Sequence, residues 1–257
     1  YAAAVVYYDR NQPEFDGMFK RLNSAADTQL DVTDLELCRQ LLRIIAPATT
    51  KKAMIYTFVH TPKELKVTAF ADGAEDFEKL SRALQCLLEH YDRTGQPKKA
   101  IEPARAMFMM GWHLMKERAR FALVAAGMEY QDSAGRALLE VYKQTNQGDK
   151  LEAMENYLDS LNTAHGRTMA KQRIVWTLDP KSGDVFNIIE NDEDRAWRVE
   201  GTLALGVVKL RQKGHRGNMR KVKELLKEAQ ASDDELIRAA AKVAQNCTKE
   251  QITRWQQ

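Results

Sequence analysis

The chain is poor in cysteine, which can cross-link a fold, and in proline, which interrupts helices. It has 257 residues but only three cysteines and six prolines. Cys38, Cys86 and Cys247 are far apart, with no Cys-x-x-Cys or Cys/His spacing. This odd and scattered set argues against a disulfide framework and against a structural zinc site. We therefore interpret the cysteines as small, partly buried apolar residues.

Long apolar runs are also missing, since no stretch reaches the roughly 20 apolar residues that a membrane-spanning helix needs. Residues 1–8 are nevertheless uncharged and end in Tyr7 and Tyr8. They fit the end of an upstream membrane anchor or signal segment with its aromatic residues at the interface, or a first helical turn packed on its own domain. We expect residues 1–12 to form an N-terminal tail and residues 13–257 a helical-repeat domain. That domain is then either membrane-anchored or cytoplasmic.

The chain has no excess of one charge. Its 39 basic and 36 acidic residues give a net charge of +3. This balance gives no global argument for a nucleic-acid or membrane partner, so any such argument must be local. Hydrophobic residues make up 44% and charged residues 29%, which is ordinary for a folded soluble protein and unlike a long disordered chain.

Motifs of common catalytic sites are absent as well. There is no GxxxxGK[ST], GxGxxG, HExxH or GxSxG, and the five histidines are isolated from one another. No His, Cys and Asp residues have metal-ligand spacing. We expect His113, on an apolar helical stretch, to be a satisfied core histidine. The sequence predicts a non-catalytic chain with no catalytic, cofactor-binding or metal residues and no cofactor. A site assembled from scattered residues is the alternative that spacing does not address.

Apolar residues recur at helical spacing along most of the chain, and glycine and proline fall mostly between such stripes. This pattern predicts an all-α fold of roughly ten helices. Residues 53–70 are the exception, because 53–59 are rich in strand formers and 65–70 could pair with them as a short β-hairpin. The capping box that begins at Thr61 favours a helix there instead. One stripe of the helical pattern consists of Phe77, Leu80, Leu84, Leu87, Leu88 and Tyr91.

The C-terminal third contains an internal repeat. Residues 185–204 align with residues 225–244 at an offset of 40 without a gap. Apolar positions match apolar positions in both halves, and an aspartate falls on an aspartate before the second half. The matched pairs are Val185/Leu225, Phe186/Leu226, Ile189/Ala229, Asp194/Asp234, Trp197/Ile237, Arg198/Arg238, Leu203/Val243 and Ala204/Ala244.

This pattern resembles the HEAT-repeat family: an apolar helix, a short acidic turn, then an aliphatic-Arg pair opening a second helix, here with the Ala-Leu-Gly ending at 204–206. The resemblance covers residues 179–250, and we take 179–257 as the HEAT-like part. Trp197 and Gly201 depart from the usual pattern. Each Asp can accept hydrogen bonds from free amides of the second helix. The Arg four residues later can lie along the stack with its stem buried and its head hydrogen-bonded.

The resemblance implies an α-α superhelix, a solenoid of stacked helical hairpins with one concave face. Residues 74–178 lack the signature and are either degenerate repeats or helical hairpins closer to the tetratricopeptide type. Such a fold predicts a scaffold or assembly subunit that binds another protein or a multi-subunit complex. A membrane contact would involve the N-terminus.

A basic segment between the two repeat units is the strongest local charge feature. Residues 209–223 hold seven Lys or Arg and no acid. They predict either a binding site for an acidic partner, anionic lipid or nucleic-acid phosphate, or a solvated loop beside a helix C-terminus. Nucleic-acid or anionic-phosphate binding through this segment is the alternative function. The candidate partner-binding residues are Lys209, Arg211, Lys213, Arg216, Arg220, Lys221 and Lys223.

Overall fold

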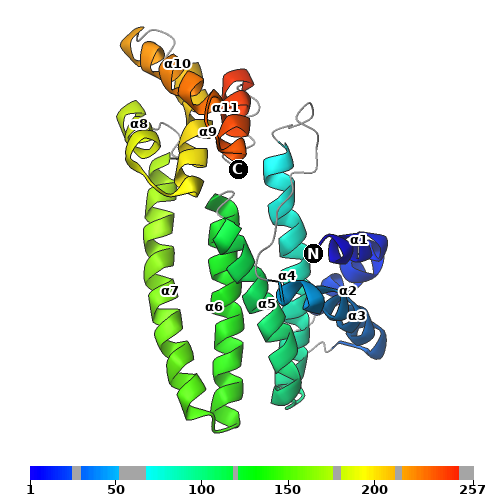
Figure 1. Ribbon diagram of the computed structural model, residues 1–257. Helices are drawn as coiled ribbons and strands as arrows, with labels where there is room; N and C mark the ends of the chain where they lie inside the picture. Colours follow the sequence, from blue (N-terminus) through cyan, green and yellow to red (C-terminus); the bar gives the residue numbers. More distant parts are fainter. Residues whose placement is uncertain (25–29, 52–67, 118–120, 176–180, 212–215, 249–257) are drawn as a thin grey trace. The chain divides into compact units, whose positions relative to one another are not determined.

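The computed structural model describes residues 1–24, 30–51, 68–117, 121–175, 181–211 and 216–248 (Figure 1). Within these ranges every regular element is a helix, which confirms the predicted all-α fold class. The alternative hairpin at 53–70 lies outside the described residues except for 68–70, which begin a helix. The helices are α1 (Ala2–Arg10), α2 (Gln12–Ser24), α3 (Val32–Thr49), α4 (Thr68–Arg93), α5 (Pro97–Glu117), α6 (Phe121–Gln144), α7 (Gly148–Val175), α8 (Ser182–Asn191), α9 (Arg195–Arg211), α10 (Arg216–Gln230) and α11 (Glu235–Asn246).

The chain folds into two units. Unit 1 consists of Tyr1–Ile55, Gly73–Glu117 and Ala126–Ala164, and unit 2 contains the remaining residues, including His165–Gln257. Unit 1 therefore holds α1 to α3, α5 and most of α4, α6 and α7, while α8 to α11 belong to unit 2.

The N-terminal residues of unit 1 form a helix that packs on its neighbours. Ala4 is fully buried and Tyr8 is 4% exposed, and the Tyr8 ring stacks on Phe15 of α2 with centroids 4.4 Å apart. Val6 faces outward and is 49% exposed. Residues 2–10 thus contribute to the core of unit 1. The prediction that they continue an upstream hydrophobic segment stays a prediction.

Two glycines let α5 and α6 approach closely. A Cβ on Gly111 would lie 2.4 Å from the carbonyl oxygen of Gly127, and a Cβ on Gly127 would lie 2.6 Å from that of Gly111. Beside this crossing, the fully buried Gln131 donates to the carbonyl of Phe108 at 3.3 Å. It also accepts a hydrogen bond of 2.6 Å from the hydroxyl of Tyr157 on α7. This buried amide links three helices of unit 1.

The C-terminal part of unit 2 consists of two helical hairpins, α8–α9 and α10–α11, that pack through their second helices. The contact is close because Gly206 of α9 has no side chain. A Cβ there would lie 2.6 Å from the sulfur of Cys247 and 3.0 Å from the carbonyl oxygen of Ala244. Small residues thus set the separation of α9 and α11.

The 40-residue repeat of the sequence is also a repeat of structure. α9 begins at residue 195 and α11 at residue 235. Each helix follows an aspartate whose side chain accepts from its first turn, Asp194 from the amide of Ala196 at 3.0 Å and Asp234 from that of Leu236 at 2.8 Å. Most matched positions are buried alike, with Trp197 and Ile237 both 4% exposed, although Phe186 and Ile189 are less buried than their partners Leu226 and Ala229. These features establish two equivalent hairpins, while the longer solenoid stays a prediction.

The arginine of the repeat is exposed rather than buried along the stack, so that part of the expectation is wrong, whereas its hydrogen-bonded head is confirmed for Arg238. Arg198 and Arg238 are exposed, and the guanidinium of Arg238 donates to the carbonyl of Ser232 at 2.6 Å within its own hairpin. Arg195 joins the hairpins instead, since it donates to both carboxylate oxygens of Asp234 at 2.6 and 3.1 Å. The first residue of α9, rather than the fourth, lies beside the cap of α11.

Candidate functional site

The predicted basic segment spans the end of α9 and the beginning of α10 in unit 2. Lys213 lies outside the described residues. Arg211 ends α9 and Arg216 begins α10, and the structure describes only the backbone of these two. The side chains of Lys209, Arg220, Lys221 and Lys223 are described, and they do not act as one group.

Two of these lysines hold unit 2 together. The ammonium of Lys209 donates to the carbonyl oxygen of Gln245 near the C-terminal end of α11 at 2.5 Å. Lys221 pairs with Glu190 of α8, and this hydrogen-bonded partner raises the pKa of Lys221. A cation at a helix C-terminus and a pair between α8 and α10 both explain positive charge without a ligand. The contacts within unit 2 therefore account for Lys209 and Lys221 without a bound partner.

Arg220 and Lys223 form the remaining basic surface. Both are exposed, and so is Lys227 one turn further along α10. Spacings of three and four residues place these side chains on one face of the helix. None of the three makes an ion pair with a residue that the structure describes. Lys227 was missed at the sequence level because it follows the acid-free stretch 209–223, and only the helix α10 brings it into line.

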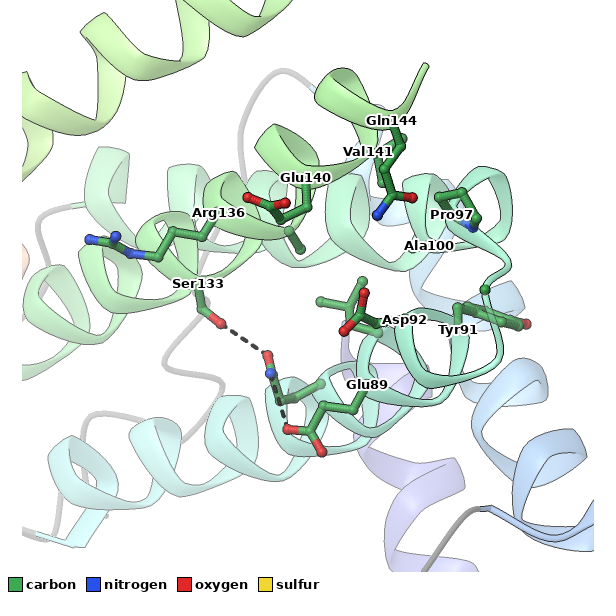
Figure 2. Close-up of a pocket in the computed structure, with 14 residues that line it drawn as sticks. Glu89, Tyr91, Asp92, Pro97, Ala100, Ser133, Arg136, Glu140, Val141 and Gln144 are labelled. Carbon is green, nitrogen blue, oxygen red and sulfur yellow. Dashed lines mark hydrogen bonds between the residues drawn. The ribbon is translucent and has the colours of Figure 1, made fainter. Parts of the chain in front are cut away.

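A second candidate site is a cleft in unit 1 between the C-terminal ends of α4 and α6 and the start of α5. It has a volume of about 380 Å³ (Figure 2). Pockets of about 300 to 1,000 Å³ are typical of ligand sites. The residues that line it are Gln85, Leu88, Glu89, Tyr91, Asp92, Gly95, Pro97, Ala100, Ser133, Arg136, Ala137, Glu140, Val141 and Gln144.

Three carboxylates border this cleft. Glu89 and Asp92 come from α4 and Glu140 from α6, and all three are among the lining residues drawn in Figure 2. A short polar chain crosses the same space. The Ser133 hydroxyl donates to Gln85 at 2.9 Å, and the Gln85 amide donates to Glu89 at 3.3 Å. This chain joins α6 to α4.

One cation lines the cleft, and it already has a partner. Arg136 donates to both oxygens of Asp132 at 2.8 and 3.0 Å, in a two-point contact along α6. The hydrogen bond to Asp132 raises the pKa of Arg136. Because the positive charge of Arg136 and the negative charge of Asp132 cancel, this pair contributes little net charge to the cleft. The walls beneath the polar groups are apolar, since Leu88, Ala100 and Val141 are 3 to 5% exposed. The cleft therefore combines an apolar floor with a negative rim.

The cleft was not predicted from the sequence, although a partial signal exists. Glu89 and Asp92 are three residues apart, and Arg136 and Glu140 are four apart. Each spacing places its pair on one helical face. Nothing in the sequence pairs the end of α4 with the end of α6, so the two faces could not be brought together.

His113, the buried histidine of α5, has structural partners at both ring nitrogens. His113 is 1% exposed. Its Nε2 lies 2.8 Å from the carbonyl oxygen of Lys51, and its Nδ1 lies 2.8 Å from the Tyr1 hydroxyl. Because a carbonyl only accepts, Nε2 carries the proton and Nδ1 accepts from Tyr1. The prediction of a satisfied core histidine is confirmed.

The described thiols and possible metal ligands also show no arrangement typical of a catalytic or metal site. Burial raises the pKa of Cys86 to about 12 and also raises the pKa values of Cys38 and Cys247, so all three are thiols at neutral pH. Among the described residues, no three His, Cys, Asp or Glu side chains are placed to hold a metal ion. No described helix combines the length and the apolar character needed to cross a membrane.

A scan against models of protein families, a search of curated proteins and a search of solved structures each returned no match. The resemblance to HEAT repeats therefore rests on the residues of this chain alone.

Proposed function

We propose that this chain is a non-catalytic scaffold or assembly subunit, built from helical repeats of the HEAT-like type, that binds another protein. The observation that carries the proposal is the structural repeat in unit 2. There α8–α9 and α10–α11 share their offset, their aspartate caps and most of their buried positions.

Repeats of this kind suit a binding surface for a physical reason. A single helical hairpin cannot bury its apolar face, and stacking a second hairpin on it completes a core while leaving long outer faces exposed. Such faces bind extended protein surfaces without a deep pocket. The outward positions of α9 to α11, together with Arg220, Lys223 and Lys227, are the proposed contacts in unit 2.

The test is co-purification with the full chain as bait from a native, detergent-solubilised lysate. We expect reproducible recovery of defined protein subunits after nuclease treatment. A matched pair of variants localises the contact: Arg220→Glu/Lys223→Glu/Lys227→Glu changes α10, while Lys20→Glu/Lys98→Glu/Arg105→Glu changes equally exposed cations of unit 1. If no protein is recovered reproducibly, or if recovery depends entirely on nucleic acid, the scaffold proposal is wrong.

A second candidate function is the binding of nucleic-acid or other anionic phosphates through α10. Arg220, Lys223 and Lys227 favour it, because they are aligned on one helix face and make no ion pair with a described residue. Three phosphate contacts on duplex DNA predict that log K falls with log salt with a slope of about −2.7. Fluorescence anisotropy with a mixed-sequence oligonucleotide measures this slope. Absent or salt-insensitive binding would eliminate this function.

A further inference from the structure

The cleft of unit 1 has the chemistry of a site for a cationic side chain. Its rim carries Glu89, Asp92 and Glu140. Arg136, the one cation among the described residues that line it, is bound at two points by Asp132. An anionic or purely apolar group would have to displace water from these carboxylates without pairing them, which is unfavourable. A positively charged group satisfies them.

The carboxylates can exchange their present contacts for a new partner, including the hydrogen bond of 3.3 Å that Glu89 accepts from Gln85. Asp92 makes no side-chain hydrogen bond or ion pair with a described residue. Glu89 pairs with Arg93 at 3.9 Å, and Glu140 with Lys143 at 3.0 Å, and every side chain in these two pairs is about half exposed. Ion pairs between exposed residues of one helix are weak and are screened by salt. An incoming cation can replace them at little cost.

The apolar floor determines what kind of cation fits. Leu88, Ala100 and Val141 lie beneath the charged rim. Lysine and arginine combine an aliphatic stem with a charged head, so the stem can cover this floor while the head reaches the carboxylates. A bare metal ion would leave the floor uncovered, and no metal-binding group is present among the described residues. Lys98 and Lys99 in the first turn of α5 are exposed, so the favourable approach is along α4 and α6.

From these features we infer that the cleft between α4, α5 and α6 is the docking site for a basic segment of a partner protein, which seats a Lys or Arg side chain on its apolar floor and against Glu89, Asp92 and Glu140. This inference rests on the proposed scaffold function and names one of its contact sites and the chemistry of the partner.

The first experiment uses a fluorescein-labelled octapeptide of alternating arginine and alanine, with the glutamate-alanine octapeptide as its counterpart. Both are titrated with the full chain and followed by fluorescence anisotropy at low and at physiological salt. We expect the arginine peptide to bind, with weaker binding at higher salt, and the glutamate peptide not to bind. Absence of binding by the arginine peptide at low salt overturns the inference.

Two variants separate the cleft from acidic surface in general. Glu89→Gln/Asp92→Asn/Glu140→Gln neutralises the rim, and we expect about a tenfold increase in Kd. Glu152→Gln/Glu155→Gln/Asp159→Asn neutralises three exposed carboxylates of α7 and should change Kd less than about twofold. Circular dichroism confirms that both variants keep their helix content. Equal weakening by the two sets would mean that the peptide binds the surface without a site.

A third variant tests the shape of the cleft with every charge retained. Ala137→Phe places a ring in the lining of the cleft and should weaken peptide binding roughly fivefold or more, since it occupies the place of the stem. An unchanged Kd would contradict the inference, because charge alone would then explain the binding.

Other occupants give distinct results. A triamine such as spermidine that competes at the peptide's own Kd would assign the cleft to small polyamines. Self-association of the wild type that the rim variant abolishes would assign it to a second copy of this chain. Either result replaces the inferred partner segment. A protein recovered equally by wild type and rim variant keeps the scaffold function and overturns the cleft. If the peptide binds at the cleft but no protein is recovered, the cleft is kept as a site for a basic side chain and the scaffold function is overturned.

Discussion

The close crossing of α5 and α6 makes Gly111→Ala the sharpest test of the fold of unit 1. The new Cβ would lie 2.4 Å from the carbonyl oxygen of Gly127 and 2.8 Å from Cγ of Gln131. Ordinary contacts need about 1 Å more. Because one of the two obstacles is backbone, the helices must separate, and the hydrogen bond from Gln131 to Phe108 is stretched with them.

The magnitude follows from three terms. Overpacking against a backbone atom costs about 3 kcal/mol, the upper part of the usual range. The weakened hydrogen bond of a buried amide costs about 1 kcal/mol. Alanine regains about 1 kcal/mol over glycine inside a helix. We therefore expect Gly111→Ala to lower the free energy of unfolding by about 3 kcal/mol.

Urea unfolding followed by circular dichroism measures this change. Gly17→Ala in α2 is the matched control, because the nearest atom to its new Cβ is the mobile end of Arg21 at 3.5 Å. The control should be neutral or stabilising by up to about 1 kcal/mol. If Gly111→Ala proves as stable as the control, α5 and α6 do not cross at these glycines and the reasoning is wrong.

Three further predictions concern pH, a buried amide and a thiol. Burial alone would raise the pKa of Asp234, but the hydrogen bond and charge of Arg195 and the helix amides lower it below its usual value. The stabilising contribution of the ionised carboxylate is thus present above about pH 4 and is lost as pH falls through the lowered pKa. The difference in thermal unfolding temperature between wild type and Asp234→Asn should therefore shrink between about pH 6 and about pH 3. Tyr157→Phe leaves the buried Gln131 oxygen without its donor and should cost about 1–2 kcal/mol in urea unfolding. Cys86, with a pKa of about 12, should react with a chromogenic disulfide reagent at pH 8 at least roughly a hundredfold more slowly in the folded than in the denatured chain.

The helical fold class and the repeat were predictable because both depend on the spacing of residues along the sequence. The stripe that includes Leu80, Leu84 and Leu87 is fully buried in α4, as its helical period requires. Asp194 and Asp234 were recognisable as caps because capping depends on residues two or three positions away. Such signals need no knowledge of the tertiary structure.

Contacts between helices could not be read in the same way. The sequence led to Arg198 and Arg238 as the residues of the stack, whereas Arg195 makes the contact between the hairpins. Its partner Asp234 is 39 residues away, so this contact depends on how the hairpins pack and leaves no local signal. The basic segment was predicted as one surface, yet Lys209 and Lys221 bond to α11 and α8. The cleft combines residues of α4 and α6 and had no local signature at all.

The joint between the two hairpins of unit 2 also has a consequence for synthesis on the ribosome. Since the Asp234 carboxylate both caps α11 and binds Arg195 at the start of α9, the second hairpin completes a contact begun by the first. The equivalent points of the two hairpins are 40 residues apart, which takes about 2 to 8 s to translate. For those seconds the face of α9 around Gly206 is bare and apolar. A pause in translation within α10 would prolong this exposure, and a chain released before α11 would keep it permanently.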